Sequence, residues 1–123
     1  MPTKHNVVGV IDDNPAILGA MGRLLSALGY STELYASNEQ FLDAALSSEA
    51  ICLIVDAQLG GRGIELARDL ARLGYTTPII FMSADLRDSV RMRAMEVGAI
   101  AFLAKPFCAD VLIEALAGFP APR

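Results

Sequence analysis

Val7-Val8-Gly9-Val10-Ile11 is a short apolar run that leads directly into two carboxylates, Asp12 and Asp13. Short apolar runs bounded by turn signals are typical of strands that are buried on both faces of a parallel sheet. Three later runs of this kind also end in a polar or charged residue. They are residues 51–55 before Asp56, residues 79–82 before Ser83, and residues 100–104 before Lys105 and Pro106.

The residues that follow these runs are expected to meet in one pocket. In an open parallel sheet, ligands bind outside the carboxyl ends of the strands. The predicted pocket combines three carboxylates, one hydroxyl and one ammonium group, which come from Asp12, Asp13, Asp56, Ser83 and Lys105.

Helical patterns separate the strands. Asn14 is a suitable N-cap before Pro15, and Gly29 supplies a stop for the first helix. A capping box of Ser37 and Gln40 predicts a short second helix. Three more helices are expected at residues 64–73, about 88–97 and about 109–117, with Gly74 and Gly98 ending the first two.

Residues 31–35 predict one more strand, which is more polar and therefore half exposed. Five strand–helix units in regular alternation predict an α/β fold: a doubly wound five-stranded parallel sheet of the flavodoxin-like (βα)5 type, with strand order 2-1-3-4-5. The stretch 56–63 is expected to be a loop, because three of the four residues 60–63 are glycine.

Length and composition indicate one well-packed domain. A chain of 123 residues has no room for a second domain, and 54% apolar with 20% charged residues is sufficient for a core. Residues 118–123 contain two prolines and are expected to be a frayed tail or the start of a linker.

Charge and hydropathy exclude several classes of function. The net charge of -4 and the scattered basic residues argue against a nucleic-acid surface. No apolar run approaches the roughly 20 residues that span a bilayer, and the first five residues do not resemble a signal peptide. We therefore expect a cytoplasmic protein without direct nucleic-acid or membrane contacts. Cys52 and Cys108 are expected to be free thiols, and His5 stands alone, so no Cys/His metal site is expected.

The predicted pocket suits a divalent cation and a phosphoryl group. Carboxylates placed close together raise one another's proton affinity unless a cation intervenes. Mg²⁺ is held by few carboxylates and keeps coordination positions that phosphate oxygens can occupy. An ammonium group, a hydroxyl donor and a carboxylate nucleophile complete the parts for phosphoryl transfer to an aspartate.

Four short motifs stand at the strand ends. They are Ile11-Asp12-Asp13-Asn14, Leu53-Ile54-Val55-Asp56, Met82-Ser83-Ala84 and Phe102-Leu103-Ala104-Lys105-Pro106-Phe107. Each alone has little specificity, but all four in this order are highly specific. Over essentially the whole chain they resemble the receiver domain of two-component response regulators. The resemblance implies a single receiver domain over residues 1–123 that is phosphorylated itself, and not an enzyme that turns over external substrates.

The resemblance also implies a role for each polar residue of the pocket. Asp56 is the phosphoacceptor, and Ser83 and Lys105 contact the phosphoryl group. Phe102 is an aromatic switch that follows the movement of Ser83, in addition to packing in the core. The Mg²⁺ ligands are three carboxylates and one backbone carbonyl, from Asp12, Asp13, Asp56 and Gln58.

The loop after Asp56 departs from the family pattern, because residues 58–63 are one residue shorter and lack the usual proline. With Gly60 in it, this loop is expected to be more mobile or differently folded, and Mg²⁺ affinity is the property most affected. Gln58 and Asp85 occupy positions that tune phosphoryl lifetime in the family. Asp85 either repels the phosphoryl group or orients water.

The implied partner is a sensor histidine kinase or a histidine phosphotransfer protein. Phosphorylation is expected to switch the face formed by the fourth helix, the fifth strand and the fifth helix. The fourth helix has more apolar residues than one buried stripe needs, which predicts a homodimer or partner surface. These residues are Leu86, Val90, Met92, Ala94, Met95 and Val97.

Two alternative functions remain open. One is a receiver-like docking module that is not phosphorylated, which follows if the shortened loop cannot bind Mg²⁺. The other is a small phosphatase of the haloacid-dehalogenase type, which also uses an aspartate nucleophile with Mg²⁺. That family has Asp-x-Asp after its first strand, whereas this chain has Asn14 at the third position. Simpler interpretations of single residues are a charged turn at Asp12 and Asp13, a turn residue at Asp56 and a solvated Lys105.

Overall fold

The computed structural model describes residues 7–58, 62–85, 87–105 and 109–117. In chain order its elements are β1 (Val7–Ile11), α1 (Pro15–Ala27), β2 (Ser31–Tyr35), α2 (Asn38–Ala44), the 3-10 turn η2 (Ala45–Ser47), β3 (Cys52–Asp56), α3 (Gly63–Arg72), β4 (Ile79–Ser83), α4 (Asp88–Glu96), β5 (Ala101–Ala104) and α5 (Ala109–Ala117).

The five strands form one parallel sheet in the order β2-β1-β3-β4-β5, which confirms the predicted strand order. The pairing aligns the carboxyl ends of neighbouring strands. Asp56 at the end of β3 is paired with Met82, and Ser83 at the end of β4 is paired with Ala104. The polar residues at the strand ends therefore lie along one edge of the sheet.

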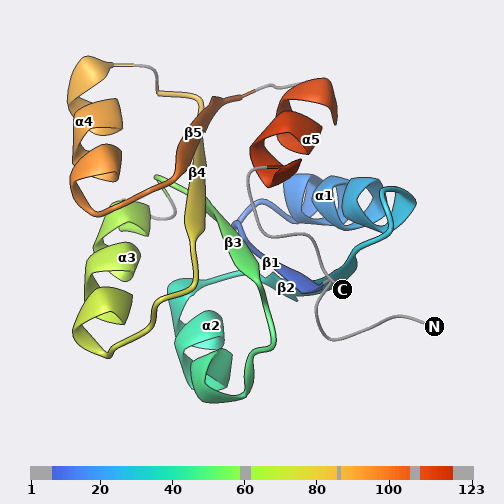
Figure 1. The fold of residues 1–123 in the computed structure, drawn as a ribbon, viewed down its shortest axis with the longest axis horizontal. Helices are drawn as coiled ribbons and strands as arrows, with labels where there is room; N and C mark the ends of the chain where they lie inside the picture. Colours follow the sequence, from blue (N-terminus) through green and yellow to red (C-terminus); the bar gives the residue numbers. More distant parts are fainter. Residues whose placement is uncertain (1–6, 59–61, 86, 106–108, 118–123) are drawn as a thin grey trace.

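Helices cover both faces of the sheet. α1 and α5 lie on one face, and α2, α3 and α4 lie on the other (Figure 1). Alternate residues of each strand point to opposite faces, so β3 supplies both cores. The core under α2, α3 and α4 includes Phe41, Leu53, Val55, Leu70, Phe81 and Ala94. The core under α1 and α5 includes Val8, Val10, Leu25, Ile54, Met82 and Leu112.

The burial of the strands follows their composition. All five residues of β1 and of β3 are buried, as the continuous apolar runs predict. The more polar strand β2 has no fully buried residue and pairs with β1 at the edge of the sheet, which confirms the prediction of a half-exposed strand.

The predicted helix caps are present. The Asn14 side chain accepts hydrogen bonds from two backbone N–H groups in the first turn of α1. The hydroxyl of the N-cap residue Ser37 accepts a hydrogen bond from Gln40 N. The Gln40 side chain accepts from Ala36 N, whereas in the usual capping box it would accept from the backbone N–H of the N-cap itself. The predicted glycine stops all have positive φ, at Gly29, Gly74 and Gly98.

Several boundaries differ from the prediction by one residue. α3 begins at Gly63 and ends at Arg72, α4 ends at Glu96, β3 begins at Cys52 and β5 begins at Ala101. An apolar run does not show which end residue closes the hydrogen-bond ladder, so such shifts are expected. The predictions on Leu86, Cys108, the glycines at 60 and 61, and residues 118–123 lie outside the described residues.

Cys52 is a fully buried free thiol in β3, as expected for an inert core residue. Burial raises the pKa of its thiol above the ordinary value, because the apolar surroundings disfavour the thiolate. Among the helices in the described ranges, none is long and apolar enough to cross a membrane.

Candidate functional site

Three carboxylates meet at the carboxyl ends of β1 and β3. One carboxylate oxygen each from Asp12, Asp13 and Asp56 lies within 4.8 Å of the others. Asp12 is fully buried, Asp56 is 8% exposed and Asp13 is exposed to solvent. The neighbouring positions of β1 and β3 in the sheet bring these side chains together across more than 40 residues of sequence.

Lys105 places one ammonium group among the carboxylates. Its Nζ lies 3.0 Å from Asp12 Oδ2 and 3.4 Å from Asp56 Oδ2, and its side chain is only 16% exposed. The backbone N–H of Lys105 donates to the carbonyl oxygen of Ser83, which ties this residue to the end of β4. With three formal negative charges and one positive charge, the cluster has a net charge of minus two.

Each buried carboxylate is oriented by a backbone N–H group two residues further along the chain. Asn14 N donates to Asp12 Oδ1 at 2.8 Å, and Gln58 N donates to Asp56 Oδ1 at 3.0 Å. Such local bonds fix the side-chain conformation and close the turn after the strand. In both residues the other oxygen, Oδ2, is the one that faces Lys105.

Ser83 uses the same kind of turn at the end of β4. Its side chain is fully buried, and Oγ accepts a hydrogen bond from Asp85 N at 2.9 Å. Because Oγ is the acceptor in this bond, the hydroxyl hydrogen is left for a second partner.

Gly63 lies directly against the end of the β3 strand. A Cβ at this position would be 2.0 Å from the carbonyl oxygen of Asp56 and 2.6 Å from the carbonyl group of Ala57. Only glycine permits this approach of α3 to the strand. From the sequence, Gly63 is one of several glycines in the expected loop. Its place just before an amphipathic helix was the only signal that set it apart.

Asp85 is held by Arg87, a residue for which the sequence predicted no role. Arg87 Nε donates to Asp85 Oδ1 at 2.9 Å, Arg87 Nη2 donates to Oδ2 at 2.5 Å, and Arg87 N donates to Oδ1 at 3.1 Å. These hydrogen bonds, together with the positive charge, hold the pKa of Asp85 below its ordinary value. Gln58 Nε2 also lies 3.4 Å from Asp85 Oδ2. The only signal in the sequence was the spacing of an acid and an arginine two residues apart.

Phe102 is a partly buried residue of β5, paired in register with Phe81. The guanidinium carbon of Arg91 lies 5.3 Å from the centre of the Phe102 ring, within the range of a cation–π contact. The ring thus packs against the core on one side and meets a cation from α4 on another.

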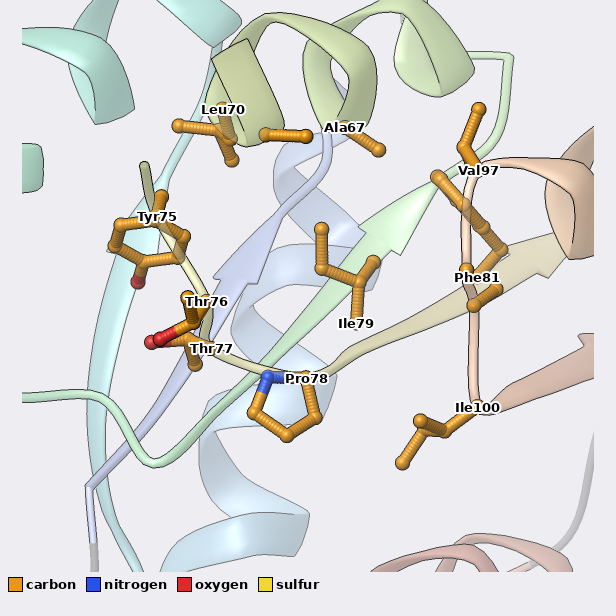
Figure 2. Close-up of a pocket in the computed structure, with 13 residues that line it drawn as sticks. Ala67, Leu70, Tyr75, Thr76, Thr77, Pro78, Ile79, Phe81, Val97 and Ile100 are labelled. Carbon is orange, nitrogen blue, oxygen red and sulfur yellow. The ribbon is translucent and has the colours of Figure 1, made fainter. Parts of the chain in front are cut away.

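Among the described residues, one hollow lies near the carboxyl ends of the strands and another near their amino ends. One, of about 530 Å³, adjoins the carboxylate cluster. Its described lining residues are apolar except for Lys105 and include Ile17, Ala20, Met21 and Leu24 of α1. The other, of about 260 Å³, lies at the amino end of β4, between the end of α3 and the turn after α4 (Figure 2). Its described lining residues include no charged side chain, so it lacks the groups for phosphoryl chemistry.

Comparison with known proteins gives a consistent result. The family model described as the response regulator receiver domain matches residues 8–117. The chain is similar to the response regulator protein TodT of Pseudomonas putida, with 32% identity over 117 residues, which are 94% of this chain and 52% of TodT. The chain spans about half the length of the curated relatives it matches.

Solved structures show the same fold. A response regulator receiver protein from Burkholderia phymatum is 35% identical, with a TM-score of 0.80 and 100% of both chains covered. A response regulator protein from Burkholderia pseudomallei, with a phosphorylated aspartic acid, a calcium ion and citrate, is 27% identical. Its TM-score is 0.82, and the match covers 90% of this chain and 66% of that one.

Proposed function

This chain belongs to the response regulator receiver domain family, and on that premise we propose that Asp56 accepts a phosphoryl group from a phosphohistidine partner. Response regulators act with histidine kinases, and a receiver domain is not an enzyme that turns over external substrates. The observation that carries the proposal is the setting of the Asp56 carboxylate. One oxygen is held by Gln58 N and the other faces Lys105 in a buried acidic cluster.

The cluster fits Mg²⁺ by its donor atoms and its charge. Hard oxygen ligands suit this ion, and the net charge of minus two is balanced by one divalent cation. Asp12, Asp13 and Asp56 would hold the ion, with the backbone carbonyl of Gln58 as the fourth predicted ligand. The related protein from Burkholderia pseudomallei contains a phosphorylated aspartic acid and a calcium ion, which supports the proposal that a divalent cation accompanies the phosphorylated aspartate.

Transfer forms one bond and breaks one. A carboxylate oxygen of Asp56 bonds to phosphorus while the N–P bond of phosphohistidine breaks and its electron pair returns to the imidazole. Lys105 neutralises charge on the phosphoryl oxygens, and the Ser83 hydroxyl donates a hydrogen bond to one of them. Mg²⁺ held by Asp12, Asp13 and Asp56 would supply further positive charge to offset the charge of the transferred group.

The new dianionic group is proposed to act as a switch. It draws the Ser83 hydroxyl and the following turn toward the phosphoryl group, which biases the domain between two states. Phe102 is proposed to follow this movement, which would change its contact with Arg91. The surface of α4, β5 and α5 would report the change to a partner.

Phosphoryl uptake is expected to require the divalent cation. With a small acyl phosphate and Mg²⁺, intact-protein mass spectrometry should show the gain of one phosphoryl group, and a chelator should prevent it. Asp13→Asn removes the exposed ligand of the cluster and should raise the Mg²⁺ concentration for half-maximal uptake at least about tenfold. Asp43→Asn, which changes an exposed carboxylate of α2, is the matched control and should leave it unchanged.

Other results would support the alternative functions. No mass gain in the wild type, with Mg²⁺ present, would favour the docking module that is not phosphorylated. Rapid turnover of unrelated phosphate esters would favour the phosphatase. Against the phosphatase stands Asn14, whose side chain caps α1 and supplies no carboxylate to the cluster.

The α4 surface supports the proposal of a homodimer or partner contact. Val90 and Ala94 are buried, whereas Met92 is 63% exposed and Met95 is 51% exposed. Light scattering with beryllofluoride, a phosphoryl mimic, is expected to show dimers, and Met92→Lys with Met95→Lys should reduce them. A monomer at high protein concentration with and without the mimic would contradict dimerisation. The cytoplasmic location and the lack of nucleic-acid contacts stay predictions.

A further inference from the structure

Asp85 joins the two loops that border the phosphorylation site. Its backbone N–H donates to Ser83 Oγ, and its carboxylate lies within hydrogen-bond distance of the Gln58 side-chain amide. Ser83 ends β4, and Gln58 follows the acceptor Asp56 by two residues. The Asp85 carboxylate therefore lies beside Gln58, whose backbone N–H holds the acceptor Asp56.

We propose that Arg87 is a positioning residue that prolongs the phosphorylated state by keeping the Asp85 carboxylate neutralised and directed at Gln58. This inference rests on the proposed function. Arg87 engages both carboxylate oxygens through its side chain and one of them again through its backbone N–H. The Asp85 side chain is only 14% exposed, whereas that of Arg87 is 76% exposed. Arg87 thus lies at the surface and contacts a carboxylate that is mostly shielded from solvent.

The charge of Asp85 is the reason why this contact matters. A carboxylate without its arginine repels an anionic phosphodonor and can accept a proton from water. In the hydrolysis that would follow, water oxygen bonds to phosphorus, the bond between phosphorus and Asp56 breaks, and Asp56 leaves as a carboxylate. The proton of the water passes to Asp85, and inorganic phosphate is released. A carboxylate occupied by Arg87 performs this step poorly, because its lone pairs already accept hydrogen bonds.

The contact between Asp85 and Arg87 is more constrained than an ordinary surface ion pair. Most exposed pairs contribute little because they are screened and mobile. Here the acid is largely covered, the arginine binds it in a bidentate manner, and two backbone N–H groups fix the turn that presents it. By contrast, Arg72 and Asp69 of α3 form a pair of 3.6 Å in which both side chains are well exposed. That pair lies at the far end of α3 from Asp56 and serves as the control.

The test measures decay of the phosphorylated protein after removal of the phosphodonor. Arg87→Met keeps the aliphatic stem and should shorten the lifetime about threefold to tenfold, with slower uptake from acetyl phosphate. Arg87→Lys should restore part of the lifetime, because it returns the charge without the bidentate geometry. Arg72→Met, with a comparable exposed arginine, should leave decay unchanged.

A double variant shows whether Arg87 acts through Asp85. In an Asp85→Asn background, Arg87→Met should change the lifetime little, because no carboxylate remains to be released. An unchanged lifetime in Arg87→Met, or an equal shortening with and without Asp85, would overturn the inference while leaving the proposed function intact. A wild-type protein that takes up no phosphoryl group would overturn the proposed function first.

Discussion

Replacing Asp56 by asparagine is expected to abolish phosphoryl uptake from both a small phosphodonor and a histidine kinase. An amide nitrogen or oxygen is a far weaker nucleophile than a carboxylate at neutral pH, so no acyl phosphate forms. The loss should be complete within the limits of intact-protein mass spectrometry, since no other carboxylate among the described residues contacts both Gln58 N and Lys105.

The fold is expected to survive this change. The amide oxygen can still accept the hydrogen bond from Gln58 N, and the removal of one charge lowers repulsion within the cluster. Circular dichroism and urea unfolding should therefore match the wild type closely. Asp43→Asn is again a suitable control for the loss of one carboxylate elsewhere. Uptake of a phosphoryl group by Asp56→Asn at the wild-type rate would place the acceptor at another residue.

Gly63→Ala is expected to destabilise the domain and to displace the acceptor at the same time. The new Cβ would lie 2.0 Å from the carbonyl oxygen of Asp56, and this neighbour is backbone that no side-chain rotation can move. Either the start of α3 or the end of β3 must shift. We expect a loss of about 2–4 kcal/mol in the free energy of unfolding, in the range of severe local strain. Urea unfolding measures this loss, and the rate of phosphoryl uptake should fall with it.

Gly19→Ala is the matched control for this substitution. Gly19 lies within α1, and a Cβ there would meet only the tip of the Arg23 side chain, at 3.4 Å. An alanine in a helix interior is favoured over glycine, so this variant should be more stable by about 0.5–1 kcal/mol. If Gly63→Ala behaved like Gly19→Ala, α3 would not press on the acceptor strand in solution.

The order of strands and helices followed from local patterns. The runs that end at Asp12 and Asp56 are apolar at every position, and a strand of this kind is stable only when both faces are covered. The caps at Asn14 and Ser37 and the stop at Gly29 act within a few residues of their own helices. Interactions of such short range can be inferred from spacing alone. The predicted elements are therefore present, with shifts of one residue at several boundaries.

The contacts around the acceptor could not be inferred in this way. Arg87 lies two residues from Asp85, but its relation to Gln58 and Asp56 depends on how closely the turns after β3 and β4 approach each other. The need for glycine at Gly63 likewise arises from the separation of α3 and β3. Neither separation is encoded in a local pattern, because each results from the packing of helices on a twisted sheet.

Parallel strand ends bring their polar residues to one edge of the sheet whatever the loops do, so the chemistry of the cluster was already present in the order of the apolar runs. Tertiary packing decided which oxygen of each carboxylate faces Lys105, how close α3 comes to Asp56, and that an arginine holds Asp85. Chemical identity is a property of each residue, whereas the distances between loops are the outcome of the whole core.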